Sequence, residues 1–189
     1  MDDLATLSFA SLEEWESWLD KNHATSCGIW LQIYKKDSGT KTIFYPEALD
    51  GALCYGWIDG QKRPLDKNSW LQRFSPRRPK SLWSRINIGH VERLTKLGKV
   101  KMAGLAAIEA AKKDGRWHAA YDSPGNARVP KDFLDALLKN KKAKSFFDTL
   151  NKTNLYSIAW RLQTAKKPET RERRMKAILQ MLASGKKFH

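Results

Sequence analysis

The sequence is poor in the residues that mark small metal-binding or disulfide-bonded chains. It has two cysteines, Cys27 and Cys54, with no CxxC pair and no histidine at metal-ligand spacing. This pattern indicates neither a disulfide framework nor a zinc site, so we expect reduced, buried thiols. The 4 histidines are scattered and form no Ser/His/Asp arrangement. We therefore expect no metal and no cofactor, and no motif in the chain specifies a reaction.

Long apolar runs are also missing. No stretch approaches the roughly 18 consecutive apolar residues of a membrane span. The beginning of the chain, MDDLATLSFASLEEW, is acidic and lacks the basic and apolar regions of a signal peptide. We therefore predict a cytoplasmic protein without a transmembrane segment. Its 189 residues, with 41% hydrophobic content and 8 Trp, are enough to bury a substantial core.

Acidic residues are scarce in one half of the chain only. Residues 1–80 carry 11 Lys and Arg against 11 Asp and Glu, a net charge of zero, whereas residues 81–189 carry 24 against 9, a net of +15. Such a field attracts nucleic acid, nucleotide phosphates, or an acidic membrane surface or protein. A lysine-rich, solvated helical surface is the alternative explanation for the same charge.

The first half of the chain predicts helices mixed with strands. Ser11 and Glu14 have the capping-box spacing, which predicts a helix from here to about Asn22. Alternating apolar residues predict a strand over 27–35. We expect further strands at 42–45, 57–60 and 69–74, and a helix at 46–55 behind a proline suited to its first turn. Residues 63–68 would connect the last two strands as a hairpin.

From residue 81 onward every predicted element is a helix. Ser81 is the expected N-cap of the first of them, which would end at Gly98. Helices are then expected at 103–113, 130–139, 141–150, 154–165 and 168–184. We therefore predict an α+β fold, with a small antiparallel sheet and helices in the N-terminal half and an all-helical C-terminal half. Residues 1–118 would form the mixed region, 119–129 a linker and 130–189 a helical region.

The strongest candidate for a binding site surrounds the predicted junction of sheet and helices. Free backbone N–H groups at a helix N-terminus, serine hydroxyls and guanidinium groups together bind phosphate, sulfate or carboxylate. The predicted anion-binding residues are Arg73, Arg77, Arg78, Lys80, Ser81, Ser84 and Arg85. The alternative is structural: Arg77 and Arg78 would pair with Asp59, Asp66 or carboxylates of the first helix.

A second group of basic residues lies at the start of the last predicted helix. It consists of Lys166, Lys167, Arg171, Arg173 and Arg174. Glu169 and Glu172 lie among them, which favours an ordinary solvated face with ion pairs. If this group shared a face with the first one, a long polyanion would be a more suitable ligand than a small phosphate.

One carboxylate and two tryptophans are the remaining candidates. Asp59 follows Trp57 in an apolar neighbourhood, and a buried carboxylate there could act as a general acid or base. A structural Asp59 held by Arg73 or Arg77 is the alternative, because no nucleophile is evident nearby in the sequence. Trp70 or Trp83 could stack a nucleobase, although the spacing of the tryptophans indicates that most belong to the core.

Several segments of the chain resemble a known family. They are residues 45–49 (YPEAL), 52–60 (ALCYGWIDG), 73–87 (RFSPRRPKSLWSRIN), 104–108 (GLAAI), 114–117 (DGRW) and 165–174 (AKKPETRERR). Together they resemble the YdeI/OmpD-associated family, also described as bacteriocin-protection proteins. The resemblance implies a bacterial protein linked to bacteriocin tolerance or envelope stress. It brings no catalytic residue and no substrate with it.

We therefore expect a YdeI/OmpD-associated-like protein that binds a phosphate-bearing or other anionic partner, with nucleic acid as one form, through a basic surface. One alternative is an enzyme acting on a small anionic metabolite, with Asp59 as general acid/base and Arg77 and Arg78 as substrate clamps. A deep pocket that joins those side chains would favour it. The other alternative is a stress-related interaction protein that binds an acidic protein partner.

Overall fold

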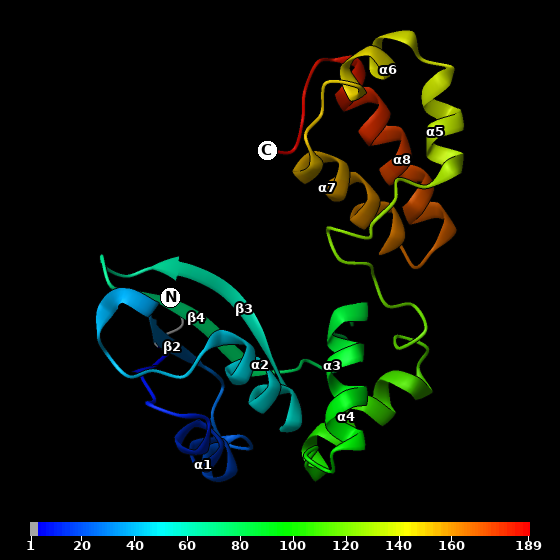
Figure 1. The fold of residues 1–189 in the computed structure, drawn as a ribbon. Coiled ribbons are helices and arrows are strands. Elements are labelled where there is room, and N and C mark those ends of the chain that lie inside the picture. The colour runs from blue at the N-terminus through cyan, green and yellow to red at the C-terminus, as the bar shows by residue number, and fades with distance from the viewer. Residues whose placement is uncertain (1–3) are drawn as a thin grey trace. The chain divides into compact units, whose positions relative to one another are not determined.

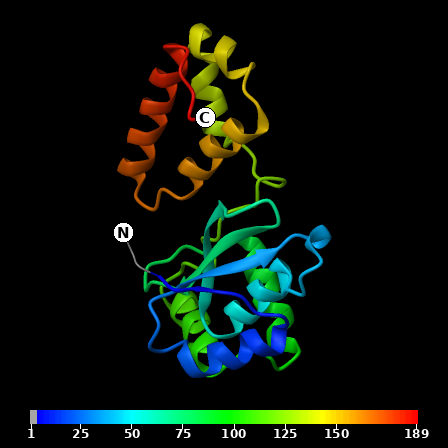
Figure 2. The same ribbon diagram turned by 90° about the vertical axis from the view of Figure 1, so that its left-hand side faces the viewer.

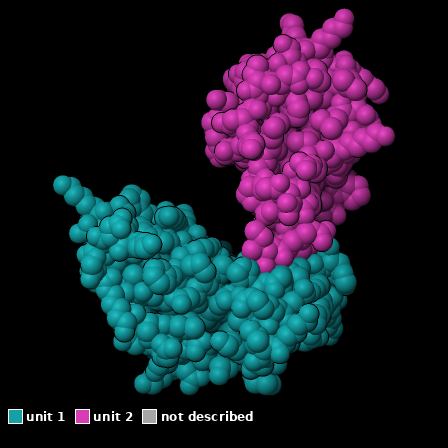
Figure 3. All heavy atoms as spheres, in the orientation of Figure 1, with its two compact units in different colours: residues 1–82, 87–118 teal, residues 83–86, 119–189 magenta. Residues whose placement is uncertain are grey.

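The fold is described by a computed structural model of residues 4–189, which divides into two compact units (Figure 3). Unit 1 comprises residues 1–82 and 87–118, and unit 2 comprises residues 83–86 and 119–189.

Unit 1 contains all the strands of the described chain and four of its α-helices (Figure 1). Its elements are β1 (Thr6–Leu7), α1 (Leu12–Asn22), β2 (Ile29–Tyr34), the 3-10 helix η1 (Lys36–Ser38), α2 (Tyr45–Cys54), β3 (Trp57–Pro64), β4 (Ser69–Pro76), α3 (Arg85–Lys96) and α4 (Met102–Lys113). The first two residues of α3 are grouped with unit 2. The strands form one sheet in the order β1-β2-β4-β3.

The sheet is mixed, so the predicted antiparallel sheet is wrong. β2 and β3 both pair antiparallel with β4, but β1 pairs parallel with β2, through Thr6 with Trp30 and Leu7 with Leu31. A parallel pair needs a crossover connection, and α1 supplies it between β1 and β2. The sequence pattern did not reveal β1 because two residues are too few to show an alternation.

The strand expected at 42–45 is absent, and Ile43 instead donates one backbone hydrogen bond to Phe9, at 3.0 Å.

One face of the sheet, the helix face, packs against α1 and α2 around a group of aromatic rings. The Trp15 ring of α1 lies 5.7 Å from the Phe74 ring of β4 and 6.4 Å from the Trp57 ring of β3. Trp15 also donates from its indole nitrogen to the carbonyl of Ala48 in α2, at 3.0 Å. Figures 1 and 2 show α1 and α2 beside the strands. This packing positions β4, the strand that leads into the candidate site.

The opposite face of the sheet carries Arg73 of β4 and Arg63 of β3, and we call it the arginine face. Trp30 is opposite Arg73, and Gln32 is opposite Leu71, in the β2–β4 ladder. Because side chains alternate along a strand, these residues and Ser75 project away from the helix face on which Phe74 lies. Gln32, Arg73 and Ser75 are half-buried. The sheet therefore presents a partly exposed polar face with one tryptophan.

The segment between β4 and α3 is held by two buried arginine contacts, and α3 starts later than predicted. Arg77 Nη1 donates to the Leu82 carbonyl at 3.2 Å, and Arg116 Nη1 donates to the Ser81 carbonyl at 2.9 Å. These two carbonyls are therefore bound to side chains, whereas in a helix they would accept from backbone N–H groups one turn later. The helix begins at Arg85, so Ser81 is not its N-cap.

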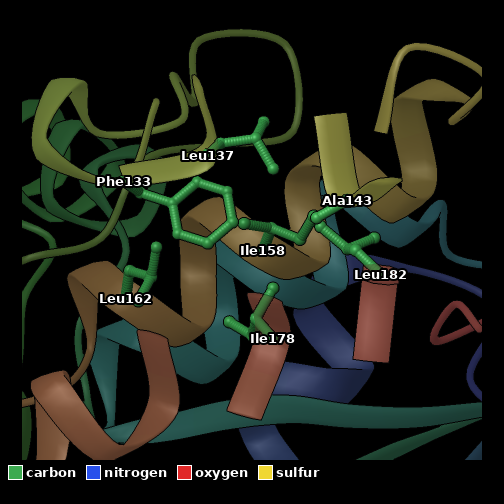
Figure 4. Close-up of a cluster of buried hydrophobic side chains, with 7 residues drawn as sticks. All are labelled: Phe133, Leu137, Ala143, Ile158, Leu162, Ile178 and Leu182. Carbon is green, nitrogen blue, oxygen red and sulfur yellow. The ribbon is translucent and has the colours of Figure 1, made fainter. Parts of the chain in front are cut away.

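Unit 2 packs four helices around an apolar core. They are α5 (Lys131–Leu138), α6 (Lys141–Phe147), α7 (Lys152–Gln163) and α8 (Pro168–Ala183). Figure 4 shows the buried side chains that meet between them. These are Phe133, Leu137, Ala143, Ile158, Leu162, Ile178 and Leu182. The prediction of an all-helical second half is wrong in part, because Ser84 and Tyr121 form an extended parallel bridge in this unit.

Helices occur in both halves of the described chain, and the fold is α+β overall. Within residues 4–189, none of the helices combines the length and the apolar character that crossing a membrane requires.

Candidate functional site

A hollow at the end of β4 in unit 1 brings together three of the predicted anion-binding residues. It has a volume of about 540 Å³. Its lining consists of Leu4, Cys27, Arg73, Ser75, Pro76, Arg77 and Arg78. Three guanidinium groups and one hydroxyl thus lie around a space large enough for a small organic phosphate, and no carboxylate is among the described lining residues. We call this space the arginine hollow.

The β4 strand and the turn after it position the arginines. Arg73 and Ser75 lie two residues apart on the arginine face, so both side chains project from the same side of β4. Arg77 is fixed by its backbone, which donates to the Gly56 carbonyl at 3.0 Å, and by its guanidinium contact to Leu82. Arg78 is exposed. Two of the arginines are therefore set by the fold, and the third extends into solvent.

The remaining residues of the predicted anion-binding group do not join this hollow. Lys80 is exposed, and Ser81 donates its backbone N–H to the Arg78 carbonyl in a turn, at 2.9 Å. Ser84 and Arg85 belong to unit 2. There the Arg85 Nε lies 2.8 Å from the Asp122 carboxylate. The cluster that is continuous in sequence is thus divided between the two units.

Asp66, one of the carboxylates considered as partners of Arg77 and Arg78, is hydrogen-bonded to the backbone of its own turn. Asp66 accepts from the backbone N–H groups of Asn68 and Ser69, each at 2.7 Å, and so closes the turn between β3 and β4. Its hydrogen bonds lower the pKa of Asp66, the one from the Asn68 backbone most. Asp66 therefore stabilises the hairpin.

Asp59 lies on the helix face and is bound to a tyrosine. The Tyr45 hydroxyl donates to the Asp59 carboxylate at 2.8 Å. Burial, and next the nearby charge of Asp59, raise the pKa of Tyr45 well above its ordinary value of 10.0. Asp59 is half-buried, is paired in register with Phe74, and does not line the arginine hollow. The arrangement that would combine Asp59 with Arg77 and Arg78 in one pocket is therefore not what the structure shows.

Two of the predicted basic residues of unit 2 bind within that unit. Arg171 forms a two-point ion pair with Asp132 of α5, with an Nη2–Oδ1 distance of 2.9 Å. Arg174 Nη1 donates to the Arg161 carbonyl of α7 at 2.7 Å. These contacts join α8 to α5 and α7. Lys166, Lys167 and Arg173 are exposed.

Of the two tryptophans considered for base stacking, Trp83 is buried and Trp70 has a lysine over its ring. Trp83 is only 2% exposed, so its ring is inaccessible to a ligand. Trp70 is half-buried, and the Lys62 ammonium lies over its ring at 4.0 Å from the centroid. Sequence reasoning missed a third tryptophan, Trp30, with the Arg63 guanidinium 4.1 Å from its ring centroid. This pair joins strands far apart in the sequence, so no local spacing could have revealed it.

The two thiols differ in solvent exposure. Cys54 is buried, and burial, followed by the charge of Glu16, raises its pKa to about 11. Cys27 is exposed and lines the arginine hollow, so the expectation that both thiols are buried is wrong. Across the part of the chain that the structure describes, no three His, Cys, Asp or Glu side chains are arranged to hold a metal ion.

Two family models match separate parts of the chain. Residues 7–107 match a domain of unknown function, DUF8412, and they include β2 to β4 and the arginine hollow except Leu4. Residues 126–185 match the family described as bacteriocin-protection, YdeI or OmpD-associated. The segment at 165–174 lies inside this second match, whereas the resembling segments between residues 45 and 87 lie in the first.

No curated protein and no solved structure shows significant similarity to the chain. The first family model covers more than half of the 189 residues, and the second covers the helices of unit 2. The chain therefore belongs to the DUF8412 family, and its residues 126–185 match the model of the bacteriocin-protection, YdeI or OmpD-associated family.

Proposed function

We propose that this protein binds phosphate-bearing partners, and nucleic acid in particular, with the arginine hollow as its main contact. The observation that supports this most strongly is the convergence of Arg73, Arg77 and Arg78 with Ser75 on one hollow. Guanidinium groups recognise phosphate through paired N–H donors, and the Ser75 hydroxyl adds another donor.

The charge of unit 2 supports a long anion as the partner. Unit 2 has 17 Lys and Arg against 6 Asp and Glu, a net charge of +11. A field of this sign raises the local concentration of a polyanion and speeds its association. Unit 2 would therefore contribute attraction, and the arginine hollow would contribute the defined contact.

The proposal can be tested by fluorescence anisotropy with labelled single-stranded and duplex DNA at increasing salt. Binding through phosphates should weaken with a log–log slope of about −0.7 per contact on single strands and about −0.9 on duplex. Arg78→Ala should weaken binding and reduce this slope by about one contact. Lys21→Ala, an exposed lysine at the end of α1, is the matched control and should have little effect.

The outcome that would refute the proposal is the absence of binding to either DNA at low salt. Equal losses in Arg78→Ala and Lys21→Ala would also count against the arginine hollow, because they would indicate a general charge effect. If only an acidic protein were bound, the protein-partner alternative would replace the present proposal.

The family description of residues 126–185 suggests where such binding would act. We propose that the protein contributes in the cytoplasm to bacteriocin tolerance or to the response to envelope stress. A strain that lacks the protein should be more sensitive to bacteriocin, and the wild-type gene should restore tolerance. If the Arg78→Ala gene restored tolerance equally well, the arginine hollow would not be needed for that role.

A further inference from the structure

The stacked pair of Trp30 and Arg63 lies beside the arginine hollow, and we propose that the two together bind one unpaired nucleotide. The base would stack on the outer plane of the Arg63 guanidinium, and its phosphate would lie in the hollow. This inference rests on the proposed function, because it names the part of the phosphate-bearing partner that unit 1 recognises.

The pair is already arranged as a stacking platform. The Arg63 guanidinium lies 4.1 Å from the centre of the Trp30 ring. Its Nη2 also donates to the Gln61 side-chain oxygen at 3.3 Å, which restrains the group on the ring. Trp30 is only 8% exposed, whereas Arg63 is exposed. The guanidinium carbon lies over the indole ring, and the exposed Arg63 side chain has its other side toward solvent.

A guanidinium plane of this kind is a recognised stacking surface for bases. Splayed-out bases in single strands stack on aromatic rings or on arginine planes. Every base has a π-face, so stacking tolerates sequence differences. The energetic cost of ordering the arginine is also reduced, because Trp30 and Gln61 already hold it in place.

Arg73 links the platform to the hollow. Arg73 is directly opposite Trp30 in the β2–β4 ladder and is one of the residues that line the hollow. Opposite residues in an antiparallel ladder have Cβ atoms only about 5 Å apart. Arg63 is opposite Leu71, two residues from Arg73, which is about 7 Å along the strand. This separation suits a base and its own phosphate.

The chemistry of the two parts favours a nucleotide with an unpaired base. The hollow offers guanidinium groups and a hydroxyl, which suit a phosphate. The platform offers a flat cationic surface, which suits a base. In a duplex the bases are stacked on one another, and their faces are unavailable to a side chain. The ligand is therefore a single strand or a free nucleotide.

The helix face supplies a matched control for this site. There the Lys62 ammonium lies 4.0 Å from the centre of the Trp70 ring. An ammonium is a point charge without a plane on which a base could stack. Lys62→Ala therefore removes a cation beside a tryptophan, as a change at Arg63 would, but leaves the proposed platform intact.

The experiment compares a labelled oligothymidylate with an abasic strand that has the same number of phosphates, at one salt concentration. The wild-type protein should bind the oligothymidylate roughly 5- to 150-fold more tightly, the range expected for one stacked base. Arg63→Lys keeps the charge and removes the plane, so the ratio of the two affinities should fall to about one. Lys62→Ala should leave both affinities and their ratio unchanged, whereas Arg78→Ala should weaken the binding of both strands.

The results separate this inference from the proposed function. Equal binding of both strands by the wild-type protein would overturn the stacking site and leave phosphate binding standing. An unchanged ratio in Arg63→Lys would also overturn it. If neither strand bound, the proposed function would fail as well. Competition by free thymidine monophosphate would support a free nucleotide as the ligand, whereas discrimination without such competition would support a single strand.

Discussion

Unit 1 and unit 2 use their cations in different ways. Unit 2 has a net charge of +11, whereas unit 1 carries 18 Lys and Arg against 14 Asp and Glu, a net of +4. Yet the more basic unit binds two of its candidate arginines internally, since Arg171 pairs with Asp132 and Arg174 contacts the Arg161 carbonyl. In unit 1 three arginines line one hollow, one of which, Arg77, also donates to the Leu82 carbonyl. Net charge thus indicates attraction for anions, and the location of a site depends on where side chains converge.

The largest expected effect tests whether the two units fold separately. Phe133 is fully buried in the core of unit 2, and Phe133→Ala should cost about 3–5 kcal/mol. That is a large part of the stability of a unit of this size. Unit 2 should therefore unfold at a lower temperature while unit 1 melts as before. Calorimetry, together with the near-ultraviolet circular dichroism of the clustered tryptophans of unit 1, measures both transitions.

The opposite result would be a single transition that shifts as a whole. Units 1 and 2 would then unfold together, so their stabilities would not be independent of each other.

The next effect concerns the packing of α4 in unit 1. A Cβ placed on Gly104 would overlap the Cys54 carbonyl oxygen and would lie 2.8 Å from a methyl group of Val100. Gly104→Ala should therefore destabilise the protein by about 1–3 kcal/mol through overpacking. Gly89→Ala is the control, because a Cβ at that position in α3 meets nothing within 4 Å.

The control should raise stability by about 0.5–1 kcal/mol, since alanine is the better helix former. Urea unfolding of both variants measures the difference. Equal effects of the same sign at the two glycines would contradict the close approach of α4 to the end of α2.

How far these features could be predicted depended on whether local or distant residues determine them. The Ser11 hydroxyl accepts from the Glu14 N–H, and the Glu14 carboxylate accepts from the Ala10 N–H, so a four-residue pattern sufficed to predict the start of α1. The start of α3 was predicted at Ser81 and lies at Arg85. Its shift depends on Arg116, which is 5% exposed and reaches the Ser81 carbonyl from 35 residues away.

In the candidate site too, some features are determined by neighbouring residues in the sequence and others by distant ones. Arg73, Arg77 and Arg78 were found because they are close together in the sequence. Their separation from Ser84 and Arg85 depends on how the chain divides into units. The partner of Asp59 is Tyr45 from α2, and the partner of Trp30 is Arg63 from β3. Such contacts follow from strand register and helix packing, which no local spacing specifies.

The smallest expected effect concerns an ion pair of unit 2. The hydrogen bonds from Arg171 lower the pKa of Asp132 below its ordinary value of 3.8. The pair therefore stabilises unit 2 above that pH, and the contribution is lost as the pH falls through the lowered pKa. Because Asp132 is 52% exposed, its solvent-screened contribution should be only about 0.2–1 kcal/mol.

Urea unfolding of Asp132→Asn and the wild-type protein at several pH values tests this contribution. The difference in unfolding free energy should be present at neutral pH and should vanish in strong acid. Asp135→Asn, on the same helix α5, removes another carboxylate of unit 2 and controls for the change in net charge. A difference that persisted in strong acid would mean that the charge of Asp132 is not its source.

The most direct test of the central claim is the binding of inorganic phosphate, measured by isothermal titration calorimetry for three proteins. These are the wild type, the double variant Arg73→Ala with Arg78→Ala in unit 1, and the double variant Lys166→Ala with Lys167→Ala in unit 2. Each double variant removes two cations, so a general charge effect would act on both alike. The arginine hollow predicts that only the first variant loses phosphate binding. Equal losses in both variants, or no binding by the wild type, would contradict it.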